Sequence, residues 1–275
     1  MKTFFIFASA FFISGSLAFA DAGPSPASAP APSVPVPTDD CAVVAPADIA
    51  ALSAIENDAT LTPSQELTRE LTLRKQLLSE TITCAVQDAN VLKETLNAVV
   101  LPADGGAAVG VNGEAIRSRL SGKIDDALNF YAIESAKVNG AGVSATQAIA
   151  KEMLAWRTVN YVPLAGDVTN FGLWATNQAL FETAGNRLTQ TGRVVTFIEG
   201  ITTTNGSLQA ALEAAQASFT AAQSANAAAG LAIGEAQPAD MTLGLIQQSL
   251  QSLANAYQTF SDLNGLIQNF LPASN

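Results

Sequence analysis

The chain has 275 residues, with 24 acidic side chains against 13 basic ones and a formal net charge of −11. An acidic chain repels nucleic-acid phosphates and anionic lipid headgroups, so nucleic acid is excluded as a partner and a membrane surface is disfavoured. The chain has no histidine, which excludes Ser-His-Asp and Cys-His nucleophile systems and nearly all zinc and copper sites.

Residues 1–20 have the pattern of a cleaved signal peptide. Lys2 precedes an uncharged apolar run over 4–17, and the small residues Ala18 and Ala20 stand at −3 and −1 before Asp21. The run is too short for a membrane-spanning helix, which needs about 20 apolar residues. The sequence therefore predicts an exported protein that is periplasmic, displayed on the cell surface or secreted.

Residues 21–45 predict a Pro/Ala/Ser-rich tether. The stretch 22–38 contains six prolines among Ala, Ser and Val, a composition that favours extended polyproline-like chain and cannot form a core. Nothing in this segment has a catalytic pattern.

The two cysteines, Cys41 and Cys84, are expected to form a disulfide because the predicted location is oxidising. The bond would close a loop of about 44 residues and contribute roughly 4 kcal/mol in the chain-entropy model. Their spacing is unlike the Cys-x-x-Cys of redox proteins, so a structural staple is the favoured interpretation, with two free buried thiols as the alternative.

The next segments are predicted to be helical. A short helix is expected over Pro46–Ala59, and Thr62, Pro63 and Gln65 form a capping box that starts a long helix ending at Leu101. Its apolar positions alternate in steps of four and three, which indicates a heptad seam: Leu78, Ile82, Ala85, Ala89, Leu92, Leu96 and Val99. The glycine-rich stretch 102–113 lacks the Gly-Lys-Ser/Thr of a phosphate loop and is expected to connect two helices.

Two further helices and a break are predicted in the middle of the chain. The third helix ends near 139–140, a capping box of Ser144 and Gln147 starts the fourth, and Pro163 is expected to break or kink the chain and marks a candidate sub-division. A long helix should then run from about Asp167 to Thr203. The three apolar stripes are Ile116, Leu120, Ile124, Ala127 and Tyr131; then Ile149, Met153, Trp156 and Val159; then Phe171, Trp174, Phe181, Leu188, Val195 and Ile198.

The segment 206–271 predicts a coiled-coil-like helical hairpin with a Gly/Pro-containing turn near 234–238. The expected seam of the first arm is Leu208, Leu212, Ala215, Phe219, Ala222, Asn226, Ala229 and Ile233. That of the second arm is Leu243, Ile246, Leu250, Leu253, Tyr257, Phe260, Asn264, Ile267 and Leu271.

The hairpin's outer positions are amides and hydroxyls with very little charge. Three interpretations compete: burial of the hairpin inside a larger bundle, self-association or docking on a partner, and insertion into a membrane. The buried amides make a lone inserted hairpin costly.

No catalytic, cofactor-binding or metal-binding residue is predicted. Asp125 and Asp126 should point in different directions on a helix, and Asp104 stands alone where a Ca²⁺ loop needs several acids. One candidate recognition patch consists of Trp156, Arg157, Tyr161 and Trp174, because Trp, Tyr and Arg dominate binding hot spots. Their helical spacing favours the alternative that they fill the core.

Together these observations predict an all-α protein, an elongated antiparallel helical bundle over 46–272. The function expected is that of an exported, non-enzymatic structural or interaction protein of the bacterial cell envelope or extracellular space. It would act through helix-face contacts with itself or with a protein partner whose identity the sequence does not give. The alternative is an α-helical pore-forming or membrane-active protein that uses the 206–271 hairpin.

Overall fold

A computed structural model describes residues 46–101, 111–201 and 206–270, which belong to one compact unit. These residues form helices and no strand, which confirms the all-α prediction. The predicted signal peptide, the tether and Cys41 lie outside the described residues, so the Cys41–Cys84 disulfide stays a prediction. In the order of the chain, the helices are α1 (Pro46–Glu56), α2 (Pro63–Ala98), α3 (Gly113–Val138), α4 (Val143–Trp156), the π-helical turn η3 (Arg157–Tyr161), α5 (Val162–Ile201), α6 (Ser207–Gly234) and α7 (Ala239–Phe270).

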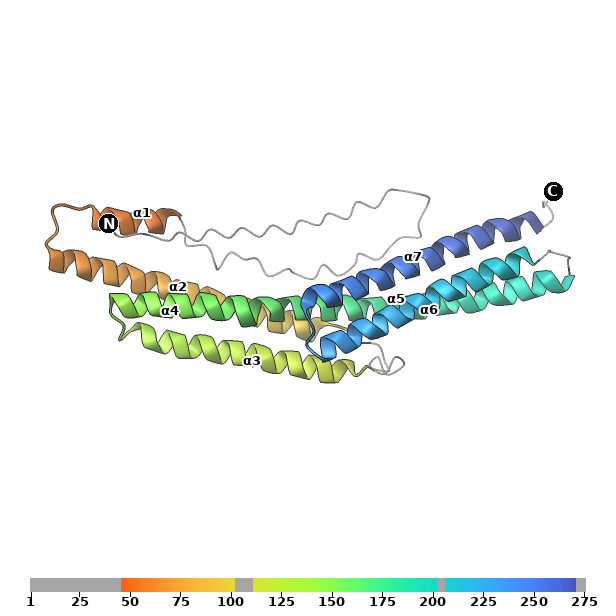
Figure 1. Cartoon of the computed structure of the whole chain (residues 1–275), viewed down its shortest axis with the longest axis horizontal. Coiled ribbons are helices and arrows are strands. Elements are labelled where there is room, and N and C mark those ends of the chain that lie inside the picture. The colour runs from red at the N-terminus through yellow and green to blue at the C-terminus, as the bar shows by residue number, and fades with distance from the viewer. Residues whose placement is uncertain (1–45, 102–110, 202–205, 271–275) are drawn as a thin grey trace. The chain divides into compact units, whose positions relative to one another are not determined.

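The helices pack as two groups that share α5. Figure 1 shows α2, α3 and α4 side by side, and α5 continues from them to lie along α6 and α7. We call the first group, with the first half of α5, the four-helix part, and the second half of α5 with α6 and α7 the three-helix part. Among the described residues, no helix is both long enough and apolar enough to span a bilayer.

The two capping boxes predicted from the sequence have different outcomes. At the start of α2, Gln65 N donates to Thr62 Oγ1 (3.4 Å) and Thr62 N donates to Gln65 Oε1 (3.0 Å), as predicted. The prediction for Ser144 and Gln147 is wrong, because α4 begins at Val143 and has Gly142 as its N-cap without a side-chain bond. Ala141, only 7% exposed, packs into the core and closes the turn to Val138 O, so the chain enters the helix before Ser144.

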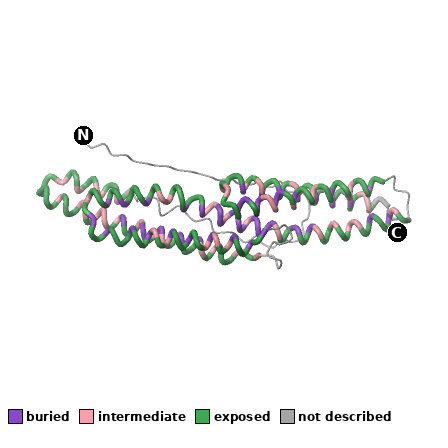
Figure 2. Tube along the Cα trace, turned by 60° about the horizontal axis from the view of Figure 1, so that its bottom comes forward, coloured by how far each residue is buried: buried purple, intermediate pink, exposed green. Residues whose placement is uncertain are grey.

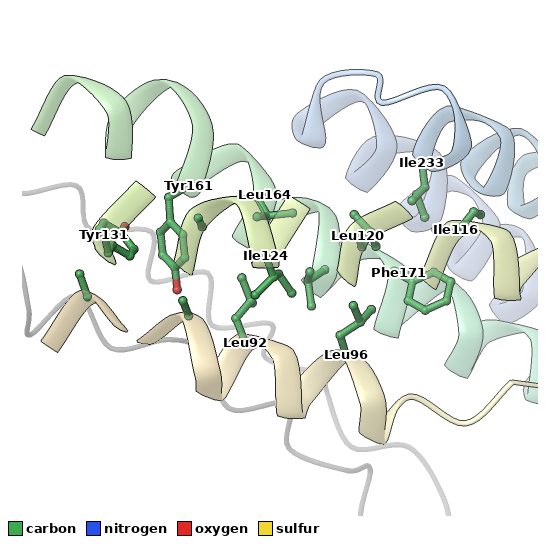
Figure 3. Close-up of a cluster of buried hydrophobic side chains, with 14 of the residues drawn as sticks. Leu92, Leu96, Ile116, Leu120, Ile124, Tyr131, Tyr161, Leu164, Phe171 and Ile233 are labelled. Carbon is green, nitrogen blue, oxygen red and sulfur yellow. The ribbon is translucent and has the colours of Figure 1, made fainter. Parts of the chain in front are cut away.

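The core of the four-helix part confirms the predicted seams of α2 and α3. On α2 all predicted seam residues except the half-buried Val99 are buried, and all five predicted positions on α3 are buried. Figure 3 shows Leu92 and Leu96 of α2 facing Leu120 and Ile124 of α3, with Leu164 of α5 beside them.

The helix continues through the predicted break at Pro163. The chain passes from α4 to α5 through η3, in which Val162 N donates to Arg157 O, a bond of the i→i+5 type. A proline cannot donate to the preceding turn, and the wider π turn accommodates it without ending the helix. The extra residue also shifts the apolar stripe: Val159, predicted to be buried, is 70% exposed, and Tyr161 is 2% exposed in its place.

The three-helix part confirms the predicted seam of α6 but corrects that of α7. All eight α6 positions are buried or half-buried. On α7 the buried positions are Thr242, Ile246, Ser249, Leu253, Ala256, Phe260 and Leu263. Alternate positions of the predicted seam are each replaced by the preceding residue: Thr242, Ser249, Ala256 and Leu263 are buried instead of Leu243, Leu250, Tyr257 and Asn264. Leu250 and Asn264 are exposed. Small Ser249 and Ala256 face inward because three helices meet there. The larger Leu250 and Tyr257 therefore lie at the sides of this contact. Figure 2 shows the buried stripes along the facing sides of the helices.

A buried polar cluster joins the three helices at one level. Asn177 Nδ2 of α5 donates to Asn226 Oδ1 of α6 (3.0 Å) and to Ser249 Oγ of α7 (2.9 Å), and Ser249 Oγ donates to Ala222 O (2.8 Å). A polar layer inside an apolar bundle penalises any register that separates its members. The cluster therefore aligns α5, α6 and α7 with one another.

Candidate functional site

A pocket with a mixed polar and apolar lining lies where α3, η3, the start of α5 and the α6–α7 turn meet. Its volume is about 410 Å³, within the range of small-molecule sites. We call it the Asp167 pocket; its lining residues are Lys123, Asp126, Trp156, Val159, Asn160, Pro163, Leu164, Asp167, Ala236, Gln237, Pro238 and Ala239.

The π turn supplies one wall of this pocket. Trp156 stacks on Phe130 with ring centroids 4.3 Å apart and an angle of 10° between the planes, which fixes the indole. Asn160 Nδ2 donates to Trp156 O (3.1 Å), so the amide oxygen of Asn160 remains as an acceptor. The irregular turn brings these side chains to one opening, as π turns in functional sites often do.

The α6–α7 turn forms the opposite wall and is held rigidly. Gln237 N donates to Ala232 O (2.9 Å) and Ala236 N to Ile233 O (3.1 Å), the bonding pattern of a Schellman motif. Ala236 stands at the left-handed position, with φ of 57°, where glycine is usual. Asn170 Nδ2 of α5 donates to Ala239 O (2.8 Å), which ties the turn to α5.

Asp167 is the most unusual residue of the pocket. It is 7% exposed, and no hydrogen bond or ion pair to its carboxylate is found within the described residues. Burial raises the pKa of the Asp167 carboxyl, and the positive charges of Lys123 and Arg119 offset this only in part. A buried carboxyl with a perturbed pKa in a pocket is a candidate for binding or chemistry.

The nearby cations do not neutralise Asp167 by direct contact. Arg119 donates through Nη2 to Ile233 O, and its Nε and Nη1 are buried without a hydrogen-bond partner. Lys123 lines the pocket and is exposed. On the same helix, Asp125 and Asp126 point in different directions, as predicted: Asp125 pairs with Lys93 Nζ at 2.6 Å, and Asp126 lines the pocket.

The four residues of the predicted recognition patch do not share one surface. Trp174 is fully buried and donates through Nε1 to Asn226 O (3.1 Å), and Tyr161 is 2% exposed and extends from η3 toward α2 (Figure 3). Arg157 Nη2 donates to Asp88 Oδ2 (2.9 Å), and its guanidinium lies 4.8 Å from the centre of the Tyr161 ring. Trp174, Tyr161 and Arg157 therefore agree with the alternative interpretation, in which these residues fill the core. Trp156 lines the Asp167 pocket instead.

A second, mostly apolar cavity of about 440 Å³ lies between α1, α2 and α4. Arg157 and Tyr131 line it together with apolar side chains that include Leu52, Leu77 and Leu154. Burial raises the pKa of the Tyr131 hydroxyl, although Arg157 beside it acts in the opposite direction. Trp156 and Arg157, adjacent in sequence, therefore contribute to two different cavities.

Sequence reasoning missed Asp167, Asn160 and Gln237. One signal was present: Asp167 lies among the buried positions Leu164, Val168 and Phe171, so it is a charged residue on an apolar stripe. The other two reach the pocket only through the π turn and the α6–α7 turn, which periodicity does not reveal.

The pocket does not have the ligand set of a metal site. Among the described residues, no group of three or more His, Cys, Asp or Glu side chains is close enough together to hold a metal ion. No known protein family, curated protein or solved structure matches the chain.

Proposed function

We propose that this chain is an exported, non-enzymatic structural or interaction protein of the bacterial cell envelope or extracellular space, which associates with a second copy of itself through the outer face of α5. The observation that carries this proposal is a row of exposed apolar side chains in the three-helix part. Leu180, Val194 and Phe197 are 40%, 42% and 67% exposed.

These side chains share one side of α5. Leu180, Arg187 and Val194 follow one another at seven-residue intervals, which places them on one face, and Phe197 lies one turn after Val194. The neighbouring face of the same helix is buried against α6 and α7 through Phe181, Ala184, Val195 and Ile198. The exposed row is thus an apolar surface beside the face through which α5 packs against α6 and α7.

The charges of this segment permit self-association. Between 180 and 199, the two acids Glu182 and Glu199 are balanced by Arg187 and Arg193, whereas the whole chain has a net charge of −11. Two copies that meet through this face therefore bring no net negative charge together. An antiparallel pair of α5 helices would bury both apolar rows.

Light scattering and chemical cross-linking of residues 21–275 over a range of concentrations test the proposal. We expect a dimer, converted to monomer by Val194→Ser with Phe197→Ser. The matched control is Ile133→Ser, which removes a 49% exposed apolar side chain from α3 and should leave the dimer intact. A monomer at every concentration, or equal dissociation by the control, would refute self-association through this face.

Export and the disulfide have their own tests. N-terminal sequencing of the secreted product should begin at Asp21, and mass spectrometry of peptides prepared without reduction should join Cys41 to Cys84. Cys84 is half-buried on α2 next to the core residue Ala85. A protein that retains residues 1–20, or that yields both cysteines as thiols after secretion, would contradict these assignments.

A further inference from the structure

We infer that the Asp167 pocket binds a small organic cation, with an ammonium or guanidinium group that donates hydrogen bonds to the Asp167 carboxylate. This goes beyond the proposed helix-face function and is independent of it, because the pocket lies at the junction of α3, η3, α5 and the α6–α7 turn and none of the residues of the α5 row lines it.

The Asp167 carboxylate has no partner within the described part of the chain. Asp167 is more than nine-tenths buried, its carboxylate oxygens are not among the fully enclosed polar atoms, and the residue lines the pocket, so the oxygens are open to a ligand there. Buried carboxylates in folded proteins are ordinarily paired or hydrogen-bonded, because an uncompensated buried charge is costly. A ligand that carries N–H donors supplies the missing partner.

The pocket carries charges of both signs. Two carboxylates, Asp126 and Asp167, line the pocket with one cation, Lys123, and Arg119 adds a second positive charge that acts on Asp167; no ion pair of either carboxylate is found in the described structure. The remainder of the lining is neutral, and the chain as a whole has a net charge of −11. The local charges balance, and the overall charge of the chain favours a positive ligand over a negative one.

The walls of the pocket suit an organic cation. Trp156 offers an aromatic surface of the kind that attracts organic cations, and Pro163, Leu164 and Pro238 provide an apolar lining for methylene groups. Asn160 keeps an amide oxygen to accept a further hydrogen bond. Because a hydrated metal ion gains nothing from aromatic and apolar walls, the combination selects an organic cation.

Calorimetric titration of residues 21–275 with four compounds of similar size tests the inference. The cationic probes are n-pentylamine, which carries one ammonium group, and agmatine, which carries a guanidinium group and an ammonium group; 1-pentanol and pentanoate have no positive charge. We expect saturable one-to-one binding of the two cations and none of the other two. Absence of binding by both cations, or equal binding of 1-pentanol or pentanoate, would overturn the inference.

Three substitutions localise the site. Asp167→Asn should weaken binding of the amines about tenfold or more, as expected for loss of a charge-assisted hydrogen bond, and Asp126→Asn should weaken it less. The matched control is Asp125→Asn, the same change one residue away on the side of α3 that faces Lys93, and it should leave the affinity unchanged. Unaltered affinity in Asp167→Asn, or an equal loss in Asp125→Asn, would refute the assignment.

A stability measurement separates a binding role from a structural one. If Asp167 serves a ligand, Asp167→Asn should not lower the melting temperature of the unliganded protein, because the charge it removes has no partner there. In addition, the amines should perturb the fluorescence of Trp156 and not that of fully buried Trp174, so Trp156→Phe should abolish the change in emission. A melting temperature lowered by several degrees together with unchanged amine binding would assign Asp167 to the fold and overturn the inference.

Discussion

Gly230 of α6 is the position where the packing of the two parts can be tested most directly. A Cβ atom added there would lie 2.8 Å from Trp174 Nε1 and 3.0 Å from Val111 Cγ1. The indole cannot move away easily, because it is fully buried and Nε1 donates to Asn226 O. Gly230→Ala must therefore displace a large core side chain, although alanine is the better helix former.

The expected effect follows from three contributions. Overpacking of a core costs about 1–3 kcal/mol, and separation of the indole N–H from its acceptor in a buried site costs about 1–3 kcal/mol. The gain in helix propensity returns about 1 kcal/mol. We expect Gly230→Ala to lower the free energy of unfolding by about 1–5 kcal/mol, measured by urea denaturation followed by circular dichroism.

The control for this experiment is Gly122→Ala in the middle of α3, where an added Cβ meets no atom within 4 Å. It should raise the free energy of unfolding by about 0.5–1 kcal/mol. In the background of Trp174→Phe, the cost of Gly230→Ala should fall by about 1 kcal/mol or more, since the two residues are in contact. If Gly230→Ala stabilises the protein as Gly122→Ala does, the close contact with Trp174 is wrong.

Three further predictions concern single features of the fold. Ala236→Gly should raise the free energy of unfolding by roughly 0.5 kcal/mol, because glycine relieves the left-handed backbone but loses more entropy on folding, whereas Ala236→Val should lower it. Asn177→Ala should cost about 2–4 kcal/mol because it leaves buried partners unsatisfied, but the double change of Asn177 and Asn226 to Leu should be nearly neutral in denaturant titrations. Burial raises the pKa of Asp167 above the ordinary value of 3.8, so the folded state binds the proton of this carboxyl more tightly than the unfolded state does. The free energy of unfolding should therefore increase as the pH falls through the raised pKa toward 3.8. Asp167→Asn should remove this pH dependence, measured by thermal melts at several pH values.

Regular periodicity accounts for the parts of the fold that were predicted correctly. The seams of α2, α3 and α6 repeat in steps of three and four residues, and burial follows those steps because each of these helices is regular over its seam. The start of α2 was also predictable, because a capping box is a local arrangement of side chain and backbone.

The errors arise where tertiary packing overrides local preference. In α7 the sequence favours the larger Leu250 and Tyr257 as core residues, but the close approach of a third helix selects Ser249 and Ala256. At Val159 a single π turn displaces the stripe, so that Tyr161 is buried instead, and no periodic template contains such a displacement. The Asp167 pocket depends on that same turn and on contacts between residues distant in sequence, so it was not predictable from spacing.

The 40-residue helix α5 contributes to the hydrophobic cores of both the four-helix part and the three-helix part. Its first half packs against α2 and α3, and its second half packs against α6 and α7. Cleavage that separates the two parts must therefore divide a helix of about 60 Å. Each fragment would then expose the apolar surface that its half of α5 had buried. We expect the protein to melt in a single transition, and limited proteolysis to yield no half-molecule that survives alone.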